Sequence, residues 1–174
     1  MISKNEYDGM EFIGCYFYHP QTSWQRYIMF GEWLWAKHTV FYDQLPHYWM
    51  EFDIYDREQK KFLSTAARQR LLTGLDFVHS VRVVDTLQTI ALTELWDMVG
   101  RSAFISEQAY QTLDADTLAH TDTSGLMEGL YIKVEDQYQV VKRYKLIRPE
   151  FVRFIVGLGE HWRKRDLVRN GLAE

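Results

Sequence analysis

Cysteine, proline and long apolar runs are scarce in this sequence. Its single cysteine, Cys15, excludes an intrachain disulfide and any zinc site built from several cysteines. No stretch approaches the ~18 consecutive apolar residues that span a membrane, and the opening residues, MISKNEYDG, lack the apolar core of a signal peptide. These absences favour an intracellular protein, located in the cytoplasm.

Several common catalytic motifs are absent as well. The sequence has no GxxxxGK[ST], GxGxxG or GxSxG pattern, which argues against P-loop, Rossmann and serine-hydrolase chemistry. Its six histidines show no ligand spacing of the HExxH type, so we interpret most of them as surface or packing residues.

The chain does have many aromatic residues and an uneven distribution of charge. Its 174 residues are 47% hydrophobic and 16% aromatic, enough for one domain with a real core. The net charge is -4, but residues 141–174 hold nine Lys/Arg against four Asp/Glu, which leaves -9 on the rest. A basic segment on an acidic body can meet a polyanion, although a helix with a solvated basic face gives the same pattern.

The order of residue patterns predicts an α+β fold with largely antiparallel sheets flanked by helices. Alternating aromatic and β-branched residues predict strands at 12–18, 26–36, 47–56 and 79–84, and a strand pair within 126–148. Helices are expected at 65–72 after an Ser64 cap, at 86–99, and from Pro149 to about residue 168. The polar stretch 102–125 is expected to hold one or two short helices or a loop that ends at Gly125.

Carboxylates interrupt two of the apolar strands. Glu32 lies in FGEWLWAKH beside Gly31, so it either faces solvent at a strand end or accepts a specific hydrogen bond. In MEFDIYD, strict alternation places Phe52 and Ile54 on one face and Glu51, Asp53 and Tyr55 on the other. A half-buried sheet edge has this pattern, and so does a pocket wall whose aromatic residue stacks on a base.

Charged residues are also threaded through the last strand pair. Glu128 and Lys133 precede four cations within seven residues, which are Lys142, Arg143, Lys145 and Arg148. A salt-bridged sheet surface explains part of this pattern. Lysines that converge on one site can instead neutralise a triphosphate, and a nearby carboxylate can hold a divalent metal.

The phrases FGEWLWAKH, FDIYD, EGLYIK and VKRYKLIRPEF, in this order, resemble motifs III, IIIa, IV and V of the covalent nucleotidyltransferases. Within them the chain is most similar to ATP-dependent RNA ligases of a bacterial and phage branch, over roughly residues 26–74 and 126–151. The resemblance implies an ATP-grasp-like adenylation domain covering residues 1–174, reduced between residues 10 and 30 and without an OB-fold domain.

The resemblance also implies roles for individual residues. Glu32 matches the glutamate that holds the nucleoside sugar, and Phe52 the aromatic that stacks on adenine. Glu128 matches the carboxylate of motif IV, associated with catalysis and with Mg²⁺ or Mn²⁺, and Lys133 closes that motif. Lys145 is the better match to the lysine at the ATP α-phosphate, and Lys142 is the alternative.

Motif I departs from the family pattern K-x-D-G. The only candidate is KNEYDG, residues 4–9, in which Glu6 takes the position of the nucleophilic lysine. Lys4 lies one two-residue strand step away, about 6.6 Å, and is a weak nucleophile candidate. Only 21 residues separate Gly9 from Gly31, fewer than relatives usually have, and Arg26 is a poor substitute for the arginine that this interval normally carries.

Three functions therefore stay open at the level of sequence. The first is an RNA ligase-like adenylyltransferase that uses ATP, Mg²⁺ and RNA ends, including nicked duplexes, which it meets through the basic C-terminal segment. The second is a degenerate homologue that binds nucleotide or RNA without self-adenylylation. The third is a DNA ligase or a capping-type guanylyltransferase.

Overall fold

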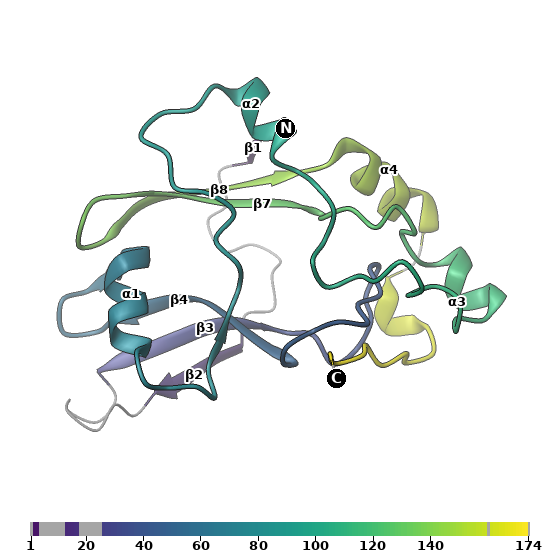
Figure 1. The fold of residues 1–174 in the computed structure, drawn as a ribbon, viewed down its shortest axis with the longest axis horizontal. Helices are drawn as coiled ribbons and strands as arrows, with labels where there is room; N and C mark the ends of the chain where they lie inside the picture. Colours follow the sequence, from purple (N-terminus) through teal and green to yellow (C-terminus); the bar gives the residue numbers. More distant parts are fainter. Residues whose placement is uncertain (1, 4–12, 18–25, 160, 174) are drawn as a thin grey trace.

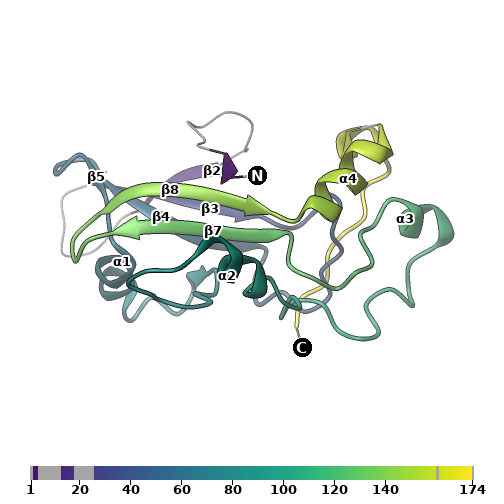
Figure 2. The same cartoon turned by 90° about the horizontal axis from the view of Figure 1, so that it is seen from above.

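Two β-sheets lie one above the other in the computed structural model, which describes residues 2–3, 13–17, 26–159 and 161–173 (Figures 1 and 2). The first sheet has the order β1-β8-β7, formed by Ile2–Ser3, Val140–Ile147 and Gly129–Glu135. The second has the order β2-β3-β4-β5, formed by Ile13–Phe17, Tyr27–Trp33, Trp49–Asp56 and Lys61–Phe62. A short strand β6, His79–Ser80, adds to β4 in parallel, and the other pairings between these described strands are antiparallel. The α+β expectation with largely antiparallel sheets is confirmed.

Short helices flank the two sheets. Helix α1, Thr65–Leu72, begins where the Ser64 hydroxyl accepts a 3.3 Å hydrogen bond from the Ala67 amide, as expected of an N-cap. Helix α4 has Pro149 in its first turn and runs to Leu158. The remaining helical elements are α2, α3 and the 3-10 turn η1, at Leu92–Asp97, Ala115–Ala119 and Trp162–Lys164. Within the described residues, no helix is long and apolar enough to cross a membrane.

Three of the predicted elements are shorter than expected. The strand expected at 79–84 is ordered as a strand only at β6, and the helix expected at 86–99 is limited to α2. Leu87 and Leu92, two apolar residues of the predicted helix, are each 51% exposed, so a longer helix does not bury them, and helices gain most of their stability from such packing. The helix from Pro149 ends near 158 rather than 168, because Gly159 adopts a left-handed φ of 63°.

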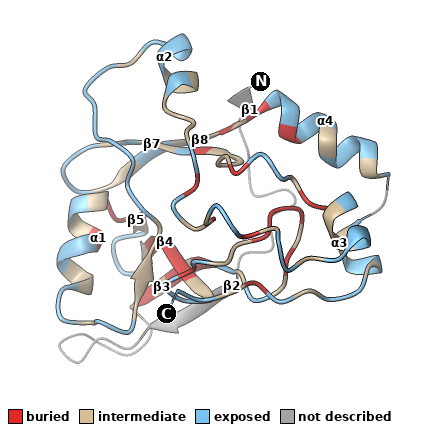
Figure 3. Cartoon of the chain, turned by 45° about the vertical axis from the view of Figure 1, so that its right-hand side comes forward, coloured by how far each residue is buried: buried red, intermediate tan, exposed pale blue. Residues whose placement is uncertain are grey.

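The core is divided into two clusters. One joins β3 and β4 to α1 through Tyr27, Met29, Ile54 and Leu63. The other joins the loop after β3, residues 102–113 and α4 through Val40, Phe41, Ile105, Ala109 and Phe151. Figure 3 shows that buried residues are concentrated along β4, whose Glu51, Asp53 and Ile54 are at most 1% exposed. This strand therefore carries two acidic side chains, Glu51 and Asp53, into the interior of the protein.

Candidate functional site

A buried aspartate connects the two sheets. Asp53 on β4 accepts a 2.7 Å hydrogen bond from the Tyr131 hydroxyl of β7 and lies 2.7 Å from the Lys133 ammonium. The Arg143 guanidinium of β8 approaches the same carboxylate at 3.7 Å. All three partners belong to the first sheet, so the face of β7 and β8 that bears them is turned toward β4.

Strand register then decides which motif V lysine shares this face. Lys145 pairs directly with Tyr131, and side chains of directly opposed residues point to the same side of a sheet. Lys142 pairs with Val134 on the opposite face, where both residues are exposed. Lys145, the better match by resemblance, is therefore turned toward the second sheet, and Lys142 is turned away from it.

Two glutamates approach Lys145 from different elements. Glu32 on β3 and Glu128, just before β7, both interact electrostatically with the Lys145 ammonium. Burial, followed by the negative charge of Glu32, raises the pKa of Glu128 to about 7, while Lys145 and the Tyr42 hydroxyl oppose this shift. Removal of water by the many protein atoms near Glu32 also raises the pKa of its carboxyl group, even though the residue keeps an exposed surface, and the Lys145 ammonium opposes this shift. The structure thus brings together three residues that sequence motifs had singled out.

A β-bulge in β4 turns the Phe52 side chain toward β7, the strand that pairs with Lys145. Phe30 pairs with Asp53 and Gly31 with Glu51, so Phe52 is the extra residue that β4 inserts between these two pairs. Such bulges redirect side chains and break the alternation of faces. The Phe52 ring meets the Tyr131 ring edge-on, with centroids 5.6 Å apart, while its backbone carbonyl accepts a 2.5 Å bond from Lys133.

The bulge makes the predicted alternation of MEFDIYD wrong. Phe52 contacts β7, whereas Ile54 packs in the core beside α1. Glu51 does not share the face of Asp53 but pairs with Arg68 of α1. Neither carboxylate lies at a half-buried edge, since Glu51 is 0% and Asp53 1% exposed.

Arg148 holds in place the segment before β7 that contains Glu128. Its backbone amide donates to the Glu128 carbonyl at 2.9 Å, and its Nε donates to the Met127 carbonyl at 2.7 Å. The buried guanidinium also bonds Asp122 and Ser124. Gly129 allows the start of β7 to approach the backbone of β8 closely, because a Cβ at this position would lie 1.8 Å from the Leu146 carbonyl oxygen.

Asn170 fixes the loop that carries Tyr42 to Glu128. The Tyr42 hydroxyl lies 3.5 Å from Glu128, and the Tyr42 amide donates to the Asn170 side chain at 2.9 Å. Asn170 is 1% exposed and also donates to the Leu34 carbonyl, at 2.8 Å, and accepts from the Tyr48 hydroxyl, at 3.0 Å. The C-terminal segment is therefore part of the support of the site.

The candidate nucleophile Lys4 and the competing Glu6 lie outside the described residues. The structure does describe β1, the strand that precedes them in the sequence, and its pairing with β8. Ser3, the last residue of β1, pairs with Lys145, and Lys4 is the next residue of the chain. Arg26, in contrast, does not join this region, because it pairs with Asp56 at 2.7 Å and with Glu58 at 3.1 Å.

Replacing Glu128 with glutamine is expected to stabilise the protein at pH 8 but not at pH 5. The pKa of Glu128 is raised from 4.5 to about 7, so its ionisation destabilises the folded state as pH rises through this window. Removing the charge recovers at most about 3 kcal/mol of unfolding free energy at pH 8. Urea unfolding at both pH values measures the difference, with exposed Glu107→Gln as the control. Equal effects at both pH values contradict the assignment.

Sequence patterns did not single out Tyr42, Tyr131, Arg148 or Asn170. Tyr42 and Tyr131 stand among many other aromatic residues, and Asn170 lies in a segment with no recognised motif. Arg148 was noted only as one of four clustered cations. Pairing across the fold, which one sequence does not reveal, gives these residues their roles.

The chain was also compared with known proteins. A family model described as RNA ligase matches residues 9–147. No curated protein and no solved structure matches the chain. The matched region contains Glu32, Phe52, Glu128 and Lys145, the residues whose convergence is described above. The chain therefore belongs to the RNA ligase family.

Proposed function

We propose that the protein binds ATP between its two sheets and acts as an RNA ligase-like adenylyltransferase. The observation that carries the proposal is the convergence of Glu32, Glu128 and Lys145 from three separate elements. The Phe52 ring contacts Tyr131, which is the strand partner of Lys145. Cations and carboxylates placed together, with an aromatic ring nearby, match the phosphates, metal and base of a nucleotide.

The two glutamates fit a magnesium ion that accompanies ATP. The negative charge of Glu32 lowers the tendency of Glu128 to ionise, and a divalent cation relieves this repulsion. Among the described residues no three His, Cys, Asp or Glu side chains gather as a metal cage. Mg²⁺ usually takes only one or two carboxylates and completes its shell with water and substrate phosphates. Glu128 is the proposed ligand, and the metal would neutralise phosphate charge.

The proposed first reaction is a transfer of AMP to a lysine. A neutral lysine amine attacks the α-phosphorus of ATP, a nitrogen–phosphorus bond forms, and the bond to the pyrophosphate oxygen breaks. Pyrophosphate leaves, and the amine releases its proton to solvent. The AMP then passes to an RNA 5'-phosphate, and a 3'-hydroxyl displaces it to join the strands. Lys4 is the candidate nucleophile because it is the lysine of KNEYDG, the phrase that resembles motif I.

A second candidate function is nucleotide binding without self-adenylylation. It is favoured by Glu6, which stands where the family pattern has its lysine and cannot form a phosphoramidate. Both candidates predict ATP binding, and only the first predicts a covalent product.

Labelling with α-³²P ATP and Mg²⁺, followed by denaturation, separates the two. Active adenylyltransfer gives a labelled band that Lys4→Ala abolishes, while calorimetry still detects ATP binding by the variant. The absence of label in a protein that binds ATP establishes the second candidate. A Glu6→Lys variant that gains label supports the motif I alignment, and failure to bind ATP at all refutes both functions.

A further inference from the structure

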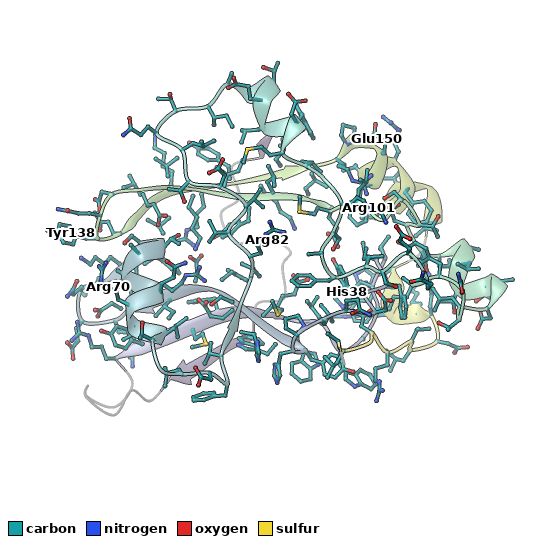
Figure 4. The ribbon with its side chains drawn as sticks, in the orientation of Figure 1. His38, Arg70, Arg82, Arg101, Tyr138 and Glu150 are labelled. Carbon is teal, nitrogen blue, oxygen red and sulfur yellow. The ribbon has the colours of Figure 1, made fainter. Side chains whose placement is uncertain are left out.

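An open hollow lies at the end of the sheets where the β7–β8 hairpin turns. It encloses about 590 Å³ and is lined from the start of β3, the β4–β5 turn, α1 and the hairpin tip. Arg70 on α1 and Tyr138 on the hairpin face it from two sides, and Figure 4 labels both at the same end of the molecule. Asp56 is the last residue of FDIYD, but none of the lining residues belongs to the candidate nucleotide site described above.

The lining of the hollow carries an excess of positive charge. Arg26, Lys61 and Arg70 contribute three cations, and Asp56 is the single acidic residue. Arg26 is already paired with Asp56 and Glu58. Lys61 and Arg70 have no salt bridge with any residue in the part of the chain that the structure describes. Asp136 at the hairpin tip interacts with the Lys61 ammonium electrostatically without a salt bridge, so Lys61 and Arg70 are the lining cations not held in an ion pair.

An exposed aromatic ring stands beside these cations. Tyr138 is 59% exposed, and the Lys61 ammonium lies 5.6 Å from its ring centroid. Leu63, Ala67 and Leu71 supply an apolar floor. Cations that alternate with an accessible aromatic ring are the features that hold the phosphates and bases of single-stranded nucleic acid.

An RNA strand whose reacting end lies between the two sheets can also reach the hollow. Tyr27 and Glu32 are at the two ends of β3, about 17 Å apart for a rise of ~3.3 Å per residue. At ~3.4 Å per nucleotide, five nucleotides of stacked RNA cover this distance. A ligand that fills both places is therefore a polymer, rather than a second mononucleotide.

We propose that this hollow binds single-stranded RNA a few nucleotides from the reacting end, with phosphates on Lys61 and Arg70 and a base on Tyr138. The inference rests on the proposed function for its account of the reacting end. It assigns the RNA strand to a surface outside the basic C-terminal segment that the sequence suggested.

Fluorescence anisotropy with a fluorescein-labelled oligouridylate of twelve nucleotides tests this assignment. Lys61→Gln/Arg70→Gln is expected to weaken binding roughly tenfold at 50 mM salt and to reduce the slope of log K against log salt by about 1.4. Tyr138→Ser is expected to weaken binding at least fivefold, which is about the lower limit for loss of one stacked base. The matched control, Arg153→Gln/Lys164→Gln, removes two exposed cations from the C-terminal segment and is expected to change binding less than twofold.

Binding of ATP is measured for every variant and is expected to be unchanged. If the Lys61→Gln/Arg70→Gln variant binds RNA as tightly as the wild type, the proposal is overturned. An equal loss of RNA affinity in the Arg153→Gln/Lys164→Gln control also overturns it, because it indicates attraction by net charge alone. Failure of the wild-type protein to bind the oligonucleotide while it binds ATP also overturns it and leaves the proposed function standing. Failure to bind ATP with RNA binding intact refutes the proposed function instead.

Discussion

Lys145→Ala is expected to reduce the rate of AMP transfer, or the affinity for ATP if no transfer occurs, by roughly 100-fold or more. Removing one preorganised electrostatic partner of a developing oxyanion typically costs 10²–10³ in rate. Lys142→Ala is the matched control, with the same side chain removed from the same strand, and is expected to change either quantity less than threefold. The difference follows from register alone, because Lys145 pairs with Tyr131 and Lys142 with Val134.

The measurement is the initial rate of label incorporation from α-³²P ATP, with calorimetric titration of ATP alongside it. Thermal unfolding of both variants verifies that each is folded. If Lys142→Ala rather than Lys145→Ala loses AMP transfer or ATP affinity, the assignment of Lys145 to the face of β8 that meets the second sheet is contradicted. A loss of similar size in both variants contradicts it equally, since it indicates a diffuse effect of charge on nucleotide binding.

The choice between these lysines illustrates what one sequence can predict. Their spacing of three residues shows that they occupy opposite faces of a strand, but not which face meets the other sheet. The contacts from Tyr131, Lys133 and Arg143 to Asp53 decide this. They join strands that are far apart in the sequence, where local pattern carries no information.

Sequence patterns predicted correctly those features that depend on interactions between residues close together in the chain. The Ser64 cap, the Pro149 helix start and the alternation of β7 and β8 depend on neighbouring residues, and the structure has all three. The predicted helix at 86–99 failed because its apolar spacing needed a surface to pack against, and residues 83–87 are exposed. Phe52 was selected by motif, yet its orientation depends on a bulge that alternation cannot anticipate.

Arg68→Met is expected to lower the free energy of unfolding by about 3–5 kcal/mol. Arg68 and Glu51 are 2% and 0% exposed, with Nη1 and Oε2 2.6 Å apart. Among the described residues, loss of the guanidinium leaves Glu51 with the Ser80 hydroxyl, at 2.7 Å, as its hydrogen-bonding side chain, and with a weaker electrostatic interaction with Lys133. A carboxylate that is buried without a cation is costly to ionise, which is why breaking such a pair destabilises more than the pair contributes.

The double variant Glu51→Gln/Arg68→Met is expected to recover most of this loss, because it removes the unpaired charge as well as its partner. Urea unfolding of the wild type, both single variants and the double variant gives the coupling energy, expected to exceed 1.5 kcal/mol. Additive losses instead indicate that Arg68 acts through packing of its side chain alone.

The same pair makes a prediction about pH and about the site. Burial raises the pKa of Glu51 and Arg68 opposes this, so removal of Arg68 raises it further. A carboxyl group with a raised folded-state pKa destabilises the protein as pH rises through that value, so the deficit of Arg68→Met is smaller at pH 5 than at pH 8. Because Glu51 directly precedes the bulged Phe52, the single variant is also expected to weaken ATP binding, with recovery in the double variant. ATP affinity that is unchanged while stability falls would separate the ion pair from the site and confine its role to the fold.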